Sequence, residues 1–203
     1  MLFTQGDATA AGDAVMRAMF EARKRVFVDL LGWDLPVLAE RYEIDQFDDA
    51  HARYLILADT DQNHLASARL LPTTQRPHLL AELFAGLCDV APPTGPDTWE
   101  ITRFCLDRDL RAAERRQWRD ALVQGLACYA LEHGIRTYVG VAEQAWLDQI
   151  IAFGWHAEPL GRVRTLGTMR LGALRIDISA ETPALLAANG IHAPVPFVQA
   201  EAA

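Results

Sequence analysis

The chain has 203 residues, of which 51% are hydrophobic and 23% charged, and this composition suits one globular domain with a sizeable core. A formal net charge of −8 argues against nonspecific binding to nucleic acid, and no apolar run reaches the length needed to span a membrane. The first residues, MLFTQGDATAAGD, lack the basic and apolar regions of a signal peptide, so we expect a cytoplasmic protein. The cysteines have no metal-binding spacing and are expected to be reduced, mostly buried thiols: Cys88, Cys105 and Cys128.

Hydrophobic spacing and turn residues predict the elements of the first half of the chain. In chain order these are a helix over 12–31 that Gly32 ends, an irregular polar segment over 34–52, antiparallel strands over 54–58 and 65–71 with a turn at 59–63, and a short helix over 79–87. The acidic sequence EIDQFDD, residues 43–49, is therefore expected in a loop.

The second half continues the alternation of strands and helices. In chain order it predicts a proline-rich loop over 91–97, a strand over 99–106, a helix over 113–133, a strand over 136–141, a helix over 143–153, strands within 155–178, a helix over 184–188 and a loose tail. This order predicts an α/β fold in which a mixed β-sheet is sandwiched between helices.

The strand over 99–106 carries a carboxylate and a guanidinium, in Glu100 and Arg103, among residues typical of a strand interior. Such residues are almost never fully buried unless they are paired, so the strand holds either a structural ion pair or a polar site. Side chains alternate along a regular strand, so these two point to opposite faces unless a bulge lies between them.

Two other segments supply matching charges. Arg69 lies on the strand over 65–71, where its planar fork can bind a carboxylate or its aliphatic stem can cover a sheet edge. The acidic segment contributes Glu43, Asp45 and Asp48, which can stay solvated, bind a ligand or hold a metal ion. Together with Glu100 and Arg103, these residues suggest a charged cleft.

A cluster of arginines precedes and enters the helix over 113–133: Arg108, Arg111, Arg115, Arg116 and Arg119. Three of them are spaced by four residues and project along the same line as the apolar stripe of that helix. Either the helix begins after Arg111, or its first turns extend past the core beside a groove. A phosphate-binding helix N-terminus and a solvated basic face both fit this pattern.

Read together, these segments resemble the acyl-homoserine-lactone synthases, the LuxI-type autoinducer synthases. The motifs that carry the resemblance are RKRVFVDLLGWD (Arg23, Phe27, Trp33), EIDQFD (Glu43, Asp45, Asp48), RLLPTT (Arg69), a later Phe84, and EITRF (Glu100, Arg103). Thr102 stands where the family more often has Ser. The resemblance runs from Arg23 to Val141, and more weakly to about Gly161.

The resemblance implies the GNAT-like fold, with a V-shaped splay where the acyl thioester enters. It implies one synthase domain over 1–203, with a mobile segment over about 1–35 that covers S-adenosylmethionine (SAM) and a loose tail over about 190–203. The expected partners are SAM and either acyl carrier protein or acyl-CoA, with no nucleic acid and no membrane. SAM is a substrate, and neither a metal nor another cofactor is expected.

The implied reaction is N-acylation of SAM followed by lactonisation, with release of methylthioadenosine. Glu100 or Glu43 is the candidate base, and Arg69 and Arg103 complete the expected catalytic set. The residues expected to bind SAM are Arg23, Phe27, Trp33, Asp45, Asp48 and Arg103. The arginines expected to dock the acyl donor are Arg108, Arg111, Arg115 and Arg119.

The residues expected to line the acyl pocket are Phe84, Thr102, Ala142 and Trp146. Ala142 falls where family members that prefer 3-oxo donors often place a Thr, so we expect a donor without a 3-oxo group. Two other functions stay open. One is an ordinary GNAT-type acyl-CoA N-acyltransferase, although RDLRAAERRQW has no glycine-rich pyrophosphate loop. The other is a non-catalytic regulator that binds SAM or an acyl group.

Overall fold

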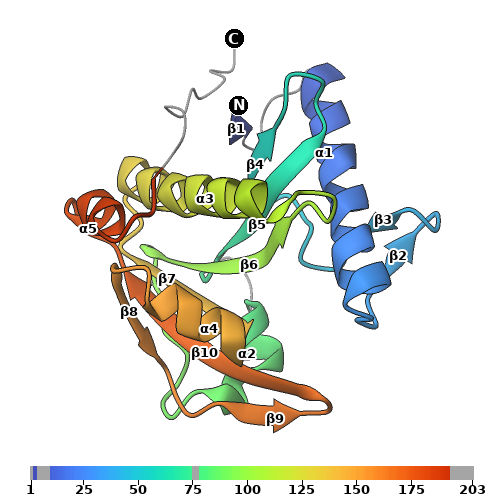
Figure 1. The fold of residues 1–203 in the computed structure, drawn as a ribbon. Helices are drawn as coiled ribbons and strands as arrows, with labels where there is room; N and C mark the ends of the chain where they lie inside the picture. Colours follow the sequence, from blue (N-terminus) through green and yellow to red (C-terminus); the bar gives the residue numbers. More distant parts are fainter. Residues whose placement is uncertain (1, 4–9, 75–77, 193–203) are drawn as a thin grey trace. The chain divides into compact units, whose positions relative to one another are not determined.

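The computed structural model describes residues 2–3, 10–74 and 78–192, and these form two compact units (Figure 1). Among the described residues, the first unit comprises 2–3, 10–69 and 103–125, and the second comprises 70–74, 78–102 and 126–192. Three elements contribute residues to both units: β5 (His64–Pro72), β6 (Thr98–Leu106) and α3 (Ala112–Glu132). The expected tail lies, from residue 193 onward, outside the described residues.

In the first unit a long helix packs on strands. Helix α1 (Ala10–Arg23) buries Val15, Met19 and Ala22 at helical spacing, and Phe20 meets Tyr54 of β4 (Arg53–Ala58) edge to face, with ring centroids 6.0 Å apart. The strands of this unit follow the order β1 (Leu2–Phe3), β4, β5 and β6. The turn at 59–63 joins β4 to β5 as predicted.

The helix predicted over 12–31 changes character after Arg23. Residues Lys24–Leu30 form a π-helical segment, η1, in which the N–H of Leu31 donates to the carbonyl of Val26. Gly32, with φ of 67°, then ends the helix as predicted. Such wide turns are frequent at functional sites, and this one carries Phe27.

The acidic segment is more ordered than the sequence suggests. Strands β2 (Val37–Leu38) and β3 (Tyr42–Glu43) pair as a small antiparallel sheet within the region that we expected to be irregular. The turn between them places Ala39 and Glu40 at φ of 51° and 56°, where Gly or Asn is usual, so the sequence held no turn signal. Glu43 therefore ends a strand, and Asp45 and Asp48 follow it.

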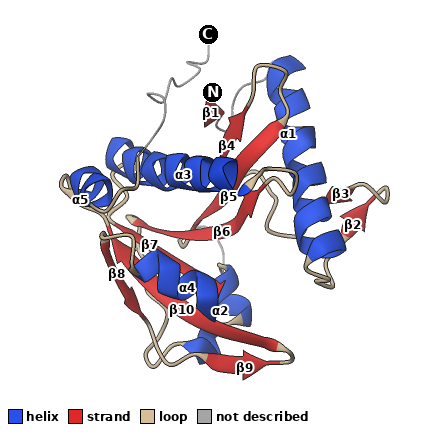
Figure 2. Ribbon diagram, in the orientation of Figure 1, coloured by secondary structure: helices blue, strands red, loops and turns tan. Residues whose placement is uncertain are grey.

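The second unit contains a mixed sheet, as predicted (Figure 2). Strand β6 runs parallel to β7 (Thr137–Glu143), and β7 is antiparallel to β10 (Met169–Asp177). Two shorter strands also pair with β10: β8 (His156–Pro159) and β9 (Arg164–Leu166).

Helices cover both faces of this sheet. On β10, Leu171 and Ala173 pack with Leu80 of α2 (Leu79–Leu83) and with Leu87 of the 3₁₀ turn η2 (Ala85–Leu87). Gly172, on the opposite face, lies so close to Leu147 of α4 (Gln144–Ile151) that an added Cβ would meet its Cδ2 at 2.6 Å. The remaining helix is α5 (Thr182–Ala188). The helix predicted over 79–87 is thus two short pieces, α2 and η2.

Candidate functional site

Six charged side chains from four segments of the first unit form one buried network, here named the charge cluster: Arg23, Glu43, Asp45, Asp48, Arg69 and Arg103. Their side chains are at most 9% exposed. The sequence placed these residues on a helix, a loop and two strands without showing that they meet.

Arg23, the last residue of α1, holds the acidic segment from one side. Its Nη1 and Nη2 donate to the two carboxylate oxygens of Asp48, each over 2.8 Å, and its Nε donates to Oε2 of Glu43 over 2.5 Å. The hydroxyl of Tyr54 also donates to Asp48, over 2.8 Å. The planar guanidinium thus binds two carboxylates at once.

Arg69 and Arg103 hold the same segment from the strands. Arg69 Nη1 donates to Asp45 Oδ1 over 2.6 Å and lies 2.9 Å from Asp48 Oδ1. Arg103 Nη2 donates to Glu43 Oε1 over 3.0 Å and to Asp45 Oδ2 over 2.7 Å. Each arginine therefore pairs with two carboxylates.

Three guanidiniums and three carboxylates make the charge cluster neutral. Burial alone raises the pKa of the Asp48 carboxyl, but Arg23 and Arg69 prevail and hold it well below its usual range. Burial likewise lowers the pKa of Arg23, but Asp48 and Glu43 outweigh it and the net shift is upward. Asp48 and Arg23 are therefore charged near neutral pH. The three carboxylates of the acidic segment are buried and paired with arginines, which excludes the solvated loop that we left open.

Aromatic rings lie against the charge cluster. Phe27 stacks on Trp33 with ring centroids 5.0 Å apart, and the guanidinium of Arg103 lies 5.7 Å from the Phe27 ring centroid. In the same way, the guanidinium of Arg23 lies 5.0 Å from the ring centroid of Phe20, and that of Arg69 lies 5.7 Å from the ring centroid of Phe47. The sequence predicted Phe27 and Trp33 as partners in one site, and the structure brings them together.

The backbone of β6 is irregular at Arg103, where φ is 51°. Buried residues alternate at positions 98, 100 and 102, and the next buried position is 105, so the alternation shifts by one residue at Arg103. A non-glycine residue with positive φ inside a strand is an outlier that marks candidate functional positions. Of the two alternatives for Glu100 and Arg103, this irregularity at Arg103 itself favours a bulge in the strand over a regular alternation of faces.

Glu100 belongs to the second unit and lies in its interior, with a side chain 0% exposed. Its Oε1 accepts the backbone N–H of Leu80, and its Oε2 lies 3.0 Å from Nδ1 of His78. The sequence analysis missed His78, because nothing in the pattern around it indicates a partner 22 residues away.

The sequence matches the family model described as autoinducer synthase over residues 7–185. An acyl-homoserine-lactone synthase of Ralstonia nicotianae is 36% identical over 194 residues, which cover 92% of this chain and 94% of the relative. The chain belongs to the autoinducer synthase family. It is therefore an acyltransferase, and its product is an acyl-homoserine lactone.

Solved structures agree with this assignment. BjaI, a CoA-dependent acyl-homoserine lactone synthase solved with SAM and isopentyl-CoA, is similar with a TM-score of 0.84 and 26% identity, covering 98% of this chain and 92% of BjaI. TofI, solved in a ternary complex with an inhibitor and MTA, is similar with a TM-score of 0.76 and 30% identity, and the match covers 92% of this chain and 96% of TofI. A putative N-acetyltransferase from Lactobacillus plantarum, at 14% identity and a TM-score of 0.60, shares the fold, which confirms the GNAT-like architecture.

The arginines expected to dock the acyl donor of this synthase divide into two pairs. Arg108 and Arg111 have exposed side chains, and α3 begins after Arg111, which decides between the two alternatives for this helix. Arg115 donates to the carbonyl of Asp107 over 2.9 Å, and Arg119 lies 2.6 Å from Asp120. The first pair is thus the better placed for an external anion.

The residues expected to line the acyl pocket of the synthase all belong to the second unit: Phe84, Thr102, Ala142 and Trp146. Phe84 packs against the cluster around Leu80, and Ala142 is buried on β7. Trp146 meets Phe153 edge to face, with centroids 5.7 Å apart. Their role in binding an acyl chain stays a prediction.

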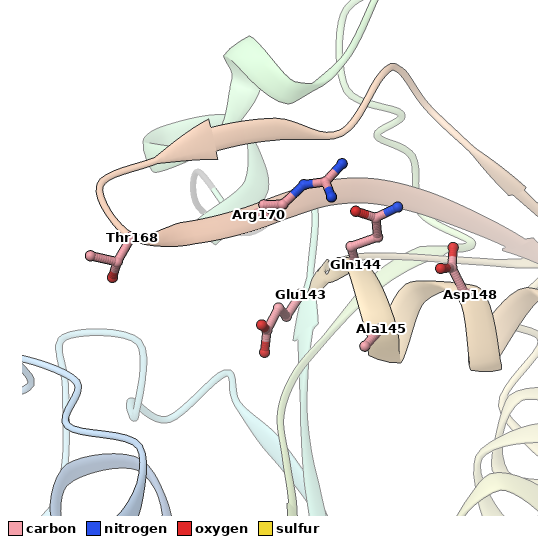
Figure 3. Close-up of a pocket in the computed structure, with 6 residues that line it drawn as sticks. All are labelled: Glu143, Gln144, Ala145, Asp148, Thr168 and Arg170. Carbon is pink, nitrogen blue, oxygen red and sulfur yellow. The ribbon is translucent and has the colours of Figure 1, made fainter.

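A pocket of about 460 Å³ also lies in the second unit, at the start of α4 (Figure 3). Its lining includes Glu143, Asp148, Thr168 and Arg170. An acyl chain requires a mainly apolar cavity, so this polar pocket does not fit one. It lies next to Ala142 and Trp146 in sequence, but neither is among its lining residues.

The cysteines are free, as predicted, and Cys105 is buried while Cys88 and Cys128 are half-buried. Burial raises the pKa of the Cys105 thiol to about 12, so it is not a nucleophile near neutral pH. Within the described ranges, we find neither a helix long and apolar enough to cross a bilayer nor a His, Cys, Asp and Glu grouping suited to a metal ion.

Proposed function

We propose that this synthase makes an N-acylhomoserine lactone from SAM and an acyl thioester, with both units acting as one synthase domain. The observation that carries the proposal is the charge cluster, which assembles the charged motif residues of the first unit into one neutral, buried network. The relatives support the substrates, because BjaI was solved with SAM and isopentyl-CoA and TofI with MTA.

The chemistry joins two steps. The neutral α-amine of SAM attacks the thioester carbonyl and displaces the thiolate. The SAM carboxylate then attacks its own Cγ, which displaces methylthioadenosine and closes the lactone. A sulfonium is already a good leaving group, so the proposal needs no metal and no cofactor besides the substrates.

In the first unit, the arginines fix the acidic segment that meets SAM. Arg23, Arg69 and Arg103 each hold two carboxylates, which leaves the site organised before SAM arrives. Arg103 and Arg69 orient the SAM carboxylate, and Asp45 and Asp48 face its positive sulfonium and amine. Phe27 and Trp33 cover SAM, and the segment over about 1–35 closes with them.

The amine needs a base before it can attack. Glu43 is poorly suited, because its oxygens already accept hydrogen bonds from Arg23 and Arg103. Glu100, in the second unit, instead accepts one backbone N–H and lies beside His78. We therefore assign the base function to Glu100 and its surroundings.

The donor is an acyl-CoA or an acyl carrier protein, and its phosphate meets Arg108 and Arg111. The acyl chain lies among Phe84, Thr102, Ala142 and Trp146, without a 3-oxo group. The similarity to BjaI, a CoA-dependent synthase, supports an acyl-CoA donor. The exposed Arg108 and Arg111 suit a phosphate group of either coenzyme A or an acyl carrier protein.

The test is methylthioadenosine release from SAM, measured with no donor, with an acyl-CoA series and with the matching acyl carrier protein series. We expect release only when a thioester is present, together with an N-acylhomoserine lactone detected by mass spectrometry. Acetyl transfer without methylthioadenosine release would instead identify an ordinary N-acyltransferase. Binding of SAM without turnover of any donor would identify a regulator.

A further inference from the structure

The carboxylate of Glu100 and the ring of His78 form a buried pair in the second unit. The side chains are 0% and 2% exposed, and Nδ1 of His78 lies 3.0 Å from Oε2 of Glu100. His78 precedes α2, and the N–H of Leu80 on the same helix donates to the other oxygen of Glu100 over 3.0 Å. One short segment therefore contacts both oxygens of the carboxylate.

The other ring nitrogen of His78 has no such contact. Nε2 is buried and has no hydrogen-bond partner among the described residues. A carboxylate without a proton can only accept hydrogen bonds, so a hydrogen bond from His78 to such a carboxylate requires the proton on Nδ1 and leaves Nε2 as an acceptor. A buried polar atom without a partner destabilises the folded state, so its presence calls for an explanation.

We propose that His78 and Glu100 form a proton-transfer dyad for the α-amine of SAM, in which Nε2 of His78 accepts the proton. This inference rests on the proposed function and refines the assignment of Glu100. One N–H bond of the ammonium breaks and its electron pair stays on the amine nitrogen, while an N–H bond forms at Nε2. Glu100 is then a positioning residue, which fixes the tautomer of His78 and stabilises the imidazolium.

The elements packed around the pair leave Glu100 as the ionic partner of His78. On β7, which pairs with β6 beside Glu100, the hydroxyl of Tyr138 donates to the carbonyl of Leu126. On α2, Glu82 is exposed to solvent. Among the described residues, no other carboxylate is paired with His78.

The decisive variant is His78→Asn. The Asn amide can take the place of Nδ1–H and keep the hydrogen bond to Glu100, but it provides no basic nitrogen. We expect kcat to fall about 10² to 10⁴-fold, with the KM for SAM changed less than about threefold. The acidic limb of the pH profile of kcat/KM should shift or vanish. The matched control is His133→Asn. His133 follows the end of α3, where its ring stacks on Tyr129 and lies 2.9 Å from the carbonyl of Tyr129, so this variant should keep wild-type kinetics.

A folded His78→Asn variant with wild-type kcat and an unchanged pH profile would overturn the dyad and leave His78 a structural role. Folding is checked by circular dichroism and thermal unfolding.

A second measurement needs neither a variant nor turnover. In the wild-type protein labelled with ¹⁵N-histidine, we expect the His78 nitrogen shifts to show a proton on Nδ1 and a free Nε2. A proton on Nε2 in the neutral ring would contradict the proposal. If the wild-type protein releases no methylthioadenosine from SAM with any thioester, the proposed function fails. The tautomer measurement still tests separately whether Nδ1 of His78 donates a hydrogen bond to Glu100.

Discussion

At the scale of single residues, the arginines of the charge cluster act through shape as well as charge. Arg23, Arg69 and Arg103 each present a planar fork to two carboxylates, and no side chain of the network is more than 9% exposed. Lysine would keep the charge but offers a single point of contact. The two amino acids are therefore not equivalent at these positions.

We accordingly predict that Arg69→Lys and Arg103→Lys each lower kcat/KM for SAM at least tenfold. Each variant leaves a buried carboxylate oxygen short of a donor, so the free energy of unfolding should fall by about 1 to 3 kcal/mol. Arg175→Lys is the matched control, because the Arg175–Asp177 pair is half-exposed and should cost about 0.5 kcal/mol or less. Near wild-type turnover in both folded variants would contradict the prediction.

Sequence indicated the residue types of the site but not all of its contacts. Spacing and motif order singled out all six members of the charge cluster. Tyr54 and His78 were missed, because Tyr54 looks like an ordinary strand residue and His78 follows a proline outside any repeating pattern. Their partners, Asp48 and Glu100, are set by tertiary packing, which no local pattern encodes.

At the scale of elements, deviations from the predicted pattern occur close to the site. Periodicity located the helix over 12–31, but it could not distinguish the π-helical segment η1 from an ordinary helix, because the apolar residues recur in both. The β2–β3 hairpin escaped prediction because its turn is built by Ala39 and Glu40. The π-helical segment η1 carries Phe27, and the β2–β3 hairpin ends at Glu43. Both deviations therefore occur at candidate site residues, where departures from local sequence preferences are expected.

The acidic segment itself should make folding sensitive to acid. The pKa of Asp48 is lower in the folded protein than in the unfolded chain, where it is about 3.9. The stabilisation is therefore complete above about pH 4 and is lost as the pH falls toward the folded-state pKa. We predict that Asp48→Asn lowers the free energy of unfolding at pH 7 by about 3 to 5 kcal/mol, because Arg23 and Arg69 lose a buried partner.

The same variant should respond less steeply to acid than the wild-type protein. Chemical denaturation between pH 7 and pH 2.5 measures this slope for both proteins. Asp177→Asn serves as the control, since Asp177 is 45% exposed and should leave the slope unchanged. Parallel slopes for Asp48→Asn and the wild-type protein would mean that Asp48 does not govern the acid response.

At the scale of the whole molecule, the order of elements was enough to predict a mixed sheet between helices, and the fold comparison agrees. The sequence could not reveal that β5, β6 and α3 each serve two compact units, because that division depends on contacts between distant segments. The V-shaped splay and the closing N-terminal segment stay predictions.

Donor docking belongs to this scale, because it concerns a partner as large as a carrier protein or coenzyme. We predict that Arg108→Glu combined with Arg111→Glu raises the KM for the acyl donor about tenfold or more, with the KM for SAM nearly unchanged. Arg162→Glu combined with Arg164→Glu makes the same change of charge at exposed positions of the second unit and is the control. An effect on SAM and none on the donor would show that the donor binds elsewhere.

Because the charge cluster is buried, dissolved salt should affect it less than it affects the exposed arginines of the protein. Dissolved ions weaken interactions between exposed charges over a Debye length of about 10 Å at 0.1 M, but they screen buried pairs much less. Arg108 and Arg111 are open to this screening, whereas Arg23 and Arg69 are sealed from it. If Arg108 and Arg111 dock the acyl donor as proposed, rising ionic strength should slow donor capture while the charge cluster stays intact, so salt should change the rate at which the lactone is made without changing which lactone is made.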